Sequence, residues 1–588
     1  MNSAATEERL RTWYRDARIG LFLHWGMRTG DYDKDPFDSE TPYAYETVED
    51  FEQAAADNGW SAQRWVTTAV RLKAKYITLA TFHCDMGYLK IWPSDVPGSP
   101  CTKRDYLREV IDAATAEGIR IVIYINRDSK HAFHHGIQWL DREAYRAYKG
   151  DEQVDIIARD GWLTYSMDVM FELLDRYPEV AGFWFDGYHD KLEAQDVFAR
   201  LHARREDLIL INNDFSDAPV ADEDAMALED FGKDCTPEFD YASGTWVGPH
   251  DKEFAFKMKW DWFYLGEGKP DWGAYELNYA NVASDQEFVK RIVTIAGSSW
   301  NAHLGYGPKI GGDFPEVVNS FTAHFEQYLS WASESIYGTY GGGYDHGGFP
   351  PGYWQDGAYG VTTLVPGERV HYLHVLTPPG GSQLTLPDAG YAVERVLDLK
   401  TAEPLAFSQQ DGWLTISSPS WDAVDRDGDR VLKLTVSAEV GVVPRNEITV
   451  STRWEMPYAP ASNVLDSHYD RYFRSAMAGQ WPQSLTFSLA DKTELRGISL
   501  VQPETGAAGE GGGYAAPVSE RIKAYEIYVS DDGETWGEAV ASGELRNQRG
   551  KQVILFPSVS ASYLRLTAKN NFGGTGTFQL ISAELLKH

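Results

Sequence analysis

Short apolar runs alternate with helical patterns from Arg18 to about Pro315, and this alternation limits the possible folds more than any other feature of the sequence. Alternation at this spacing predicts parallel βαβ units, because parallel strands must be joined by a long crossover that is usually helical. The predicted strands are 18–26, 75–83, 119–126, 181–186 and 208–213, and the predicted helices are 61–74, 104–117, 161–176 and 192–205. The strands end in polar residues, which fits an α/β fold of the (β/α)8-like TIM barrel type.

The pattern changes after Trp331, where the helical signal fades and Gly, Tyr, Pro and Asp become frequent. Short alternating strands then follow in two blocks, which is typical of antiparallel β-sandwiches. We therefore expect three domains: a barrel over 1–337, a β-sandwich over 338–446 and a second all-β domain over 447–588.

The charge balance excludes some classes of partner. The chain has 54 Lys+Arg against 87 Asp+Glu and a formal net charge of −33, a field that repels nucleic acid and anionic membranes. Aromatic residues make up 13% of the chain, and their flat faces suit stacking on sugar rings as well as core packing. Binding to nucleic acid or to a membrane is therefore not expected.

The polar N-terminus shows no signal peptide, and no apolar stretch reaches 18 residues. A cytoplasmic protein is expected, or a secreted one if a leader has been removed. The three cysteines show no metal-ligand spacing, and the histidines of the 131–135 segment fit a solvated loop, so no metal is expected in the site. The oligomeric state stays open.

The apolar segment Gly182–Phe185 ends in a single carboxylate, Asp186, followed by Gly187. A strand this apolar has no solvent face, which suits an inner parallel strand. Enzymes with barrel folds place their chemistry at the carboxyl ends of such strands, although an Asp there can also be an ordinary helix cap. Asp186 is accordingly the first candidate for a catalytic residue.

Six motifs in order, over roughly residues 14–340, resemble glycoside hydrolase family 29, the α-L-fucosidases. They are RIGLFLHWG (18–26), AKYITLATFHCDMGYLKIW (74–92), TKRDYL with EGIRIVIYI (102–125), WFDG (184–187), TPE (236–238), and RIVTIAGSSWNAHLGYGP with SIYGTY (291–308 and 335–340). The resemblance implies a barrel fold, an exo-acting retaining glycosidase and a carbohydrate partner, with no cofactor for catalysis.

Two carboxylates serve a retaining glycosidase, one as nucleophile and one as acid/base. The resemblance implies Asp186 as nucleophile. The acid/base is expected among Glu229, Asp230, Asp234 and Glu238; the family motif favours Glu238, and Glu229 is the alternative. The residues expected to contact the sugar are His24, Trp25, His83, Cys84, Tyr124, Trp184 and Trp260.

Three departures from the family pattern concern the sugar. Cys84 stands where the family has a second histidine, the stretch 212–215 lacks the usual arginine, and Ile125 replaces a second tyrosine. Two function hypotheses therefore remain. One is a glycosidase for fucose or a fucose-configured sugar such as L-galactose or a D-arabino-type pyranose, and the other is a catalytically silent carbohydrate-binding protein on the same fold.

The last ~140 residues resemble a discoidin-like, coagulation-factor type C carbohydrate-binding module, through WPQSLTFSLA, ELRGISLV, KAYEIYVSDDGETW and ASYLRLTAKNN. Such modules often hold a structural Ca²⁺ through loop oxygens. A structural Ca²⁺ in this module is therefore an expectation.

Overall fold

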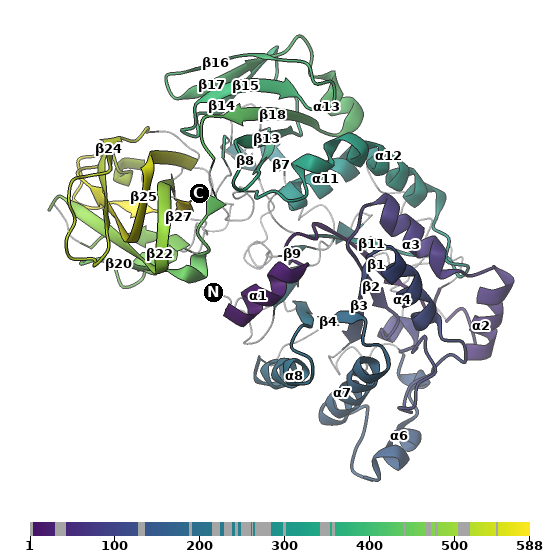
Figure 1. The fold of residues 1–588 in the computed structure, drawn as a ribbon. Helices are drawn as coiled ribbons and strands as arrows, with labels where there is room; N and C mark the ends of the chain where they lie inside the picture. The colour runs from purple at the N-terminus through teal and green to yellow at the C-terminus, as the bar shows by residue number, and fades with distance from the viewer. Residues whose placement is uncertain are drawn as a thin grey trace.

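The computed structural model describes residues 4–29, 43–126, 136–186, 191–213, 224–228, 238–240, 245–247, 260–261, 263–264, 284–297, 301–341, 353–354, 359–439, 441–465, 472–476, 480–503, 518–547 and 551–587. In these residues a parallel sheet with its helices is followed by two antiparallel β regions (Figure 1). No helix in these ranges has the length and apolar character needed to cross a membrane.

A nine-stranded sheet forms the N-terminal part, in the order β10-β11-β1-β2-β3-β4-β5-β6-β9. All of its pairings are parallel, which confirms the interpretation of the strand–helix alternation. The strands are β1 (Ile19–His24), β2 (Tyr76–Ala80), β3 (Arg120–Asn126), β4 (Val180–Asp186), β5 (Ile209–Asn213), β6 (Ala225–Leu228), β9 (Trp260–Asp261), β10 (Phe263–Tyr264) and β11 (Ala302–Tyr306).

The helices of this part have local signals at their ends. The side chain of Asp105 accepts a hydrogen bond from the Arg108 amide at the start of α4, and the chain turns away from α4 through Gly118 at a φ of +70°. The helices are α1 (Ala4–Thr12), α2 (Val48–Asp57), α3 (Ala62–Arg71), α4 (Tyr106–Ala116), α6 (Arg142–Lys149), α7 (Arg159–Arg176), α8 (Lys191–Arg204), α11 (Asp285–Gly297) and α12 (Glu316–Ala332).

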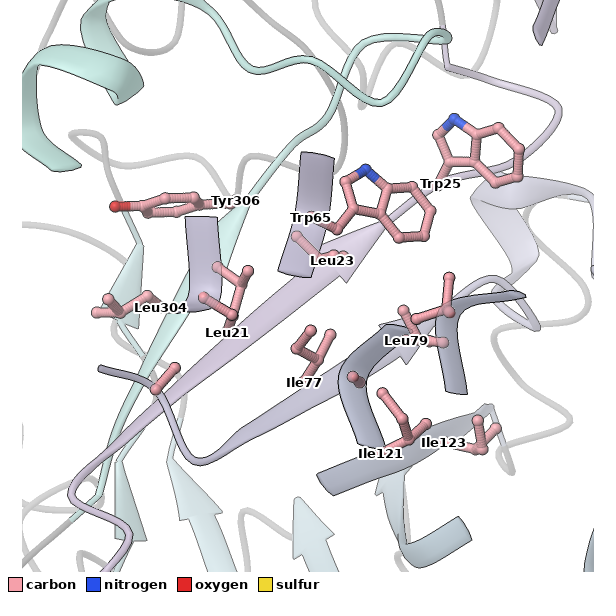
Figure 2. Packing of buried hydrophobic residues seen from close by; sticks show 14 of the residues in the cluster. Leu21, Leu23, Trp25, Trp65, Ile77, Leu79, Ile121, Ile123, Leu304 and Tyr306 are labelled. Atoms are coloured by element: carbon pink, nitrogen blue, oxygen red, sulfur yellow. The ribbon is translucent and has the colours of Figure 1, made fainter. Parts of the chain in front are cut away.

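Alternate residues of each strand point to opposite faces, and one face packs against helices. Figure 2 shows aliphatic side chains of β1, β2, β3 and β11 on this face, with Trp65 of α3 packed beside them. The labelled strand residues are Leu21, Leu23, Ile77, Leu79, Ile121, Ile123, Leu304 and Tyr306. This large buried cluster holds the strands in place.

The opposite face, which we call the aromatic face, carries Phe22, Tyr76, Tyr124 and Trp184, all fully buried. Leu10 of α1 belongs to the same cluster, so the N-terminal helix covers part of this face. A buried ion pair fixes α1 there, with an Arg9 Nη2 to Asp224 Oδ1 distance of 2.7 Å. The aromatic face is therefore closed to solvent over much of its area.

The middle region consists of two antiparallel sheets, in the orders β12-β13-β18-β15 and β14-β17-β16. Their elements are β12 (Gly360–Leu364), β13 (Val370–Val375), β14 (Gln383–Pro387), β15 (Val393–Asp398), β16 (Ala406–Gln410), β17 (Trp413–Ser417), α13 (Asp422–Asp427) and β18 (Arg430–Val436). A buried Asp429 accepts from the Tyr328 hydroxyl of α12 at 2.6 Å and lies 2.7 Å from the His374 ring nitrogen, which ties this region to α12.

The terminal region is a seven-stranded sheet in the order β19-β27-β22-β25-β23-β24, with β20 paired to β22, plus a β21-β26 pair. The strands are β19 (Gly441–Val442), β20 (Ile448–Ser451), β21 (Phe473–Arg474), β22 (Gln483–Val501), β23 (Ala524–Ser530), β24 (Ala541–Glu544), β25 (Lys551–Ala568), β26 (Gln579–Leu580) and β27 (Ser582–Lys587). The sheet thus extends upstream of residue 447, because β19 pairs with β27.

One buried carboxylate joins the terminal region to the segment that follows α12. Glu584 of β27 is 2% exposed and accepts hydrogen bonds from Tyr340 (2.5 Å), Tyr353 (3.0 Å) and Lys551 (2.9 Å). Val553 and Leu586 of the terminal sheet also belong to the buried cluster of the middle region. The two antiparallel regions therefore share both a polar and an apolar contact.

Candidate active site

Asp186 is the last residue of β4 and lies on the aromatic face, two residues after Trp184. It is almost completely buried, with 6% of its surface exposed. The parallel register pairs Asp186 with Asn126 at the end of β3. The strand therefore delivers one carboxylate at the carboxyl end of the sheet, as the sequence predicts.

Tyr124 of β3 donates a hydrogen bond from its hydroxyl to Asp186 Oδ2 at 2.5 Å. Burial, together with the negative charge of Asp186, raises the pKa of Tyr124 well above its usual value, so the hydroxyl stays protonated and remains a donor. The Tyr124 ring stacks on Trp184 with centroids 5.3 Å apart. Trp184 has no exposed surface, and this stacking holds the tyrosine in position.

His24 ends β1 on the same face, and His83 follows β2. The His83 ring centroid lies 5.6 Å from that of His24 and 5.2 Å from that of Tyr124. Burial lowers the pKa of His24 well below its usual value, and His83 and His303 lower it further, so His24 is neutral at pH 7. A neutral imidazole can both donate and accept a hydrogen bond, as a sugar hydroxyl requires.

Cys84 lies at the edge of this group, with its Sγ 3.7 Å from His83 Nδ1. It is 6% exposed, and its carbonyl oxygen accepts a hydrogen bond from the Tyr43 hydroxyl at 2.9 Å. The structure thus brings together six of the residues predicted from sequence. They are Asp186, Tyr124, Trp184, His24, His83 and Cys84.

Trp25 lies elsewhere, although the sequence predicts it as a sugar contact. It follows His24 and therefore projects to the helix-covered face, where it packs against Trp60 and Trp65. Figure 2 shows Trp25 and Trp65 on this face. Its ring is fully buried in that apolar cluster. The one-residue step that places His24 on the aromatic face places Trp25 against the helices.

The backbone of Glu238 begins the short strand β7 (Glu238–Asp240), which pairs antiparallel with β8 (Thr245–Val247). Trp260 begins β9 and pairs with Ala227 of β6. The side chains of Glu238 and Trp260 lie outside the part of the chain that the structure describes, as do Glu229, Asp230 and Asp234. These assignments stay predictions.

Sequence reasoning missed two residues of the aromatic face, Asn126 and His303. Asn126 ends β3 two residues after Tyr124, and His303 of β11 packs against Phe22 with centroids 4.7 Å apart. Burial lowers the pKa of His303 to about 3. Side chains two residues apart on a strand share a face. This period gives Asn126 when it is counted from Tyr124, and it gives His303 when it is applied to the segment AHLGY (302–306).

No group of three or more His, Cys, Asp or Glu side chains among the described residues is placed to hold a metal ion. The histidines at 131, 134 and 135 lie outside those residues.

Replacing Tyr124 by phenylalanine removes the hydroxyl but keeps the ring that stacks on Trp184. Hydrogen bonds to charged groups contribute about 1.5–3 kcal/mol, so we expect kcat/KM to fall by roughly 10- to 100-fold. The melting temperature should change little. Steady-state kinetics and thermal unfolding of Tyr124→Phe check both expectations, and wild-type kinetics in the variant would show that the 2.5 Å contact has no part in activity.

The described residues thus form an α/β fold with a parallel sheet and a buried carboxylate, Asp186, at the carboxyl end of a strand. The family model for α-L-fucosidase matches residues 1–334, and a model for the F5/8 type C domain matches residues 447–582. The chain therefore belongs to the α-L-fucosidase family of glycoside hydrolases and carries an F5/8 type C domain after the catalytic part.

The curated relative "Tissue alpha-L-fucosidase" of Bos taurus is 22% identical over 364 residues, which cover 56% of this chain and 69% of the relative. Among solved structures, α-L-fucosidase isoenzyme 1 from Paenibacillus thiaminolyticus superposes with a TM-score of 0.53 at 19% identity, covering 74% of this chain and all of that one. A family 29 α-L-fucosidase from Bacteroides thetaiotaomicron, solved as a trapped covalent intermediate, gives a TM-score of 0.52 at 18% identity and covers 74% of this chain and 97% of that one. At these identities the likeness to solved structures supports the fold.

Proposed function

We propose that the protein is an exo-acting retaining glycosidase that removes terminal fucose, or a fucose-configured sugar, by double displacement with Asp186 as nucleophile. The observation that carries the proposal is the buried Asp186 carboxylate, which accepts the Tyr124 hydrogen bond at a strand end of a family member. The buried, neutral His24 offers a two-way hydrogen-bonding group that suits an uncharged sugar, and the buried His83 ring lies next to it.

In the first step the Asp186 carboxylate attacks the anomeric carbon, the glycosidic C–O bond breaks, and the acid Glu238 protonates the leaving oxygen. In the second step Glu238 takes a proton from water, the water oxygen attacks the same carbon, and the bond to Asp186 breaks. The Bacteroides thetaiotaomicron relative, trapped as a covalent intermediate with 2-fluoro-fucosyl fluoride, supports this route. The chemistry needs no cofactor.

The strand order supports closure of the sheet into the barrel that the sequence predicts. β9 pairs with β6 and β10 pairs with β11, and only Trp262 separates β9 from β10 in the sequence. β9 and β10 stand at the two ends of the strand order, so their closeness in the sequence brings those ends together. The residues at the carboxyl ends of β1, β3 and β4 then surround one opening, where barrel enzymes bind substrate.

The acid/base role of Glu238 predicts a dependence on the leaving group. Glu238→Ala should slow substrates with poor leaving groups far more than nitrophenyl substrates, because only a poor leaving group needs the proton. Azide should restore turnover of the activated substrates by attacking the glycosyl-enzyme. If Glu229→Ala shows this behaviour and Glu238→Ala does not, the acid/base is Glu229.

A panel of nitrophenyl glycosides tests the proposed function. We expect the fastest hydrolysis on an α-L-fucoside or on the L-galactose or D-arabino counterpart. Activity on the simple fucoside should be modest, since Cys84 replaces a histidine and a thiol is a weak hydrogen-bonding group. Sugar binding without hydrolysis of any member of the panel would favour the alternative, a catalytically silent carbohydrate-binding protein.

The F5/8 type C domain is proposed to bind carbohydrate and to hold a structural Ca²⁺. Four of its segments, 466–471, 477–479, 504–517 and 548–550, lie outside the described residues, so the ligands of the ion are not assigned.

A further inference from the structure

Asn126 has a buried side-chain amide and lies on the strand next to Asp186. It is fully buried, and neither its Nδ2 nor its Oδ1 has a hydrogen-bond partner among the described residues. Its backbone is fixed, because Trp162 Nε1 donates to its carbonyl oxygen at 3.0 Å. Buried polar side chains usually have partners, so an amide without one needs an explanation.

The position of Asn126 shows where a partner would lie. It follows Tyr124 by two residues on the aromatic face and is paired in register with Asp186 on the adjacent strand. Neighbouring strands lie about 4.8 Å apart. The amide also lies close enough to the Tyr124 hydroxyl to oppose the rise of that pKa, although no hydrogen bond of ordinary geometry joins the two. The amide therefore points toward the ligand end of the sheet, alongside the carboxylate.

A sugar attacked by Asp186 has two polar groups next to its anomeric carbon, the ring oxygen and the 2-hydroxyl. The ring oxygen accepts only, and it gains positive charge in the oxocarbenium-like transition state, which an N–H donor would oppose. The 2-hydroxyl both donates and accepts, so it can pair with either polar atom of Asn126.

We propose that Asn126 binds the 2-hydroxyl of the sugar held by Asp186 and so contributes to the choice of substrate. The proposal rests on the proposed glycosidase function. Hydrogen bonds to the 2-hydroxyl strengthen in the transition state of glycoside hydrolysis, so Asn126 contributes mainly to kcat/KM.

The test compares Asn126→Ala with wild type on nitrophenyl α-L-fucoside and on its 2-deoxy analogue. We expect kcat/KM on the fucoside to fall by roughly 10- to 100-fold and kcat/KM on the 2-deoxy analogue by less than about threefold. An equal fall on both substrates would overturn the proposal. Thr78→Val is the matched control. Thr78 lies in the interior of β2, and its Oγ1 is another buried oxygen without a partner among the described residues. Removing this oxygen should leave both rates unchanged.

Stability gives a second readout that does not depend on which sugar is hydrolysed. Replacing a side chain that supports the fold lowers the free energy of unfolding. Replacing an amide that serves ligand binding does not lower it. The nearly isosteric Asn126→Leu should therefore unfold at the wild-type temperature or above it. A clearly lower melting temperature for Asn126→Leu would assign Asn126 a structural role and contradict the proposal. If the wild-type protein hydrolyses no member of the glycoside panel, the proposed function itself is wrong.

Discussion

Replacing Asp186 by asparagine is expected to lower kcat by about 10⁴-fold or more, the scale seen when a covalent nucleophile is removed from an enzyme. An amide oxygen is a very weak nucleophile, so the glycosyl-enzyme cannot form. The fold should be retained in Asp186→Asn, because the amide oxygen of the new side chain can still accept the hydrogen bond from the Tyr124 hydroxyl. The melting temperature should therefore stay near that of the wild type.

The control for this variant is Asp112→Asn, which alters an exposed aspartate that pairs with Arg108 on α4. It should keep wild-type kinetics. Near wild-type turnover of Asp186→Asn on an active substrate, measured with a preparation free of the wild-type enzyme, would show that another group is the nucleophile.

The second large effect concerns the buried Glu584. Replacing it by glutamine removes the negative charge that faces the Lys551 ammonium at 2.9 Å, where both side chains are almost completely buried. Breaking a buried pair by removing one partner costs about 3–5 kcal/mol, so the free energy of unfolding of the terminal region should fall by that amount. Urea unfolding and calorimetry of the full chain both measure this change in the free energy of unfolding.

Two comparisons separate this effect from a general loss of charge. Glu544→Gln removes one partner of an exposed pair with Lys523 at 3.8 Å and should have almost no effect. The double variant Glu584→Gln with Lys551→Met should recover much of the stability, because no buried charge remains. A single variant as stable as wild type would mean that the network does not stabilise the terminal region.

The same network predicts a dependence on pH. Burial raises the pKa of Glu584, but the charges of Lys551 and Arg445 and the Tyr340 hydrogen bond outweigh it and lower the pKa to about 2. Because the folded pKa lies below the unfolded one, the stabilisation is complete above the usual glutamate range and is lost as the pH falls toward about 2. In Glu584→Gln this part of the acid sensitivity should be absent.

The sequence predicts the strands and helices around Asp186 well, because each has a local cause. The apolar segment before Asp186 becomes β4, and the helix predicted over 104–117 becomes α4. His24, His83 and Tyr124 can also be placed near Asp186 from the sequence, because parallel strands end at the same edge of a sheet.

Other features depend on contacts that no local pattern encodes. Whether His24 or Trp25 lies on the aromatic face is decided by which face of β1 the helices cover. The proposed role of Asn126 depends on its register with Asp186. The hydrogen bond from Tyr340 to Glu584 joins residues that are 244 positions apart in the chain. The first contact forms only when the parallel sheet assembles, and the second only when the terminal region packs against the segment after α12.

The proposed mechanism depends most directly on Asp186 forming the covalent bond of a glycosyl-enzyme. The decisive measurement is mass spectrometry of the protein after incubation with 2-deoxy-2-fluoro-α-L-fucosyl fluoride, followed by proteolysis and sequencing of the labelled peptide. The proposed mechanism predicts one fluorofucosyl group on the peptide of β4, attached to Asp186, and none in Asp186→Asn. A label on another residue, or turnover of the reagent with inversion at the anomeric carbon and no adduct, would contradict it.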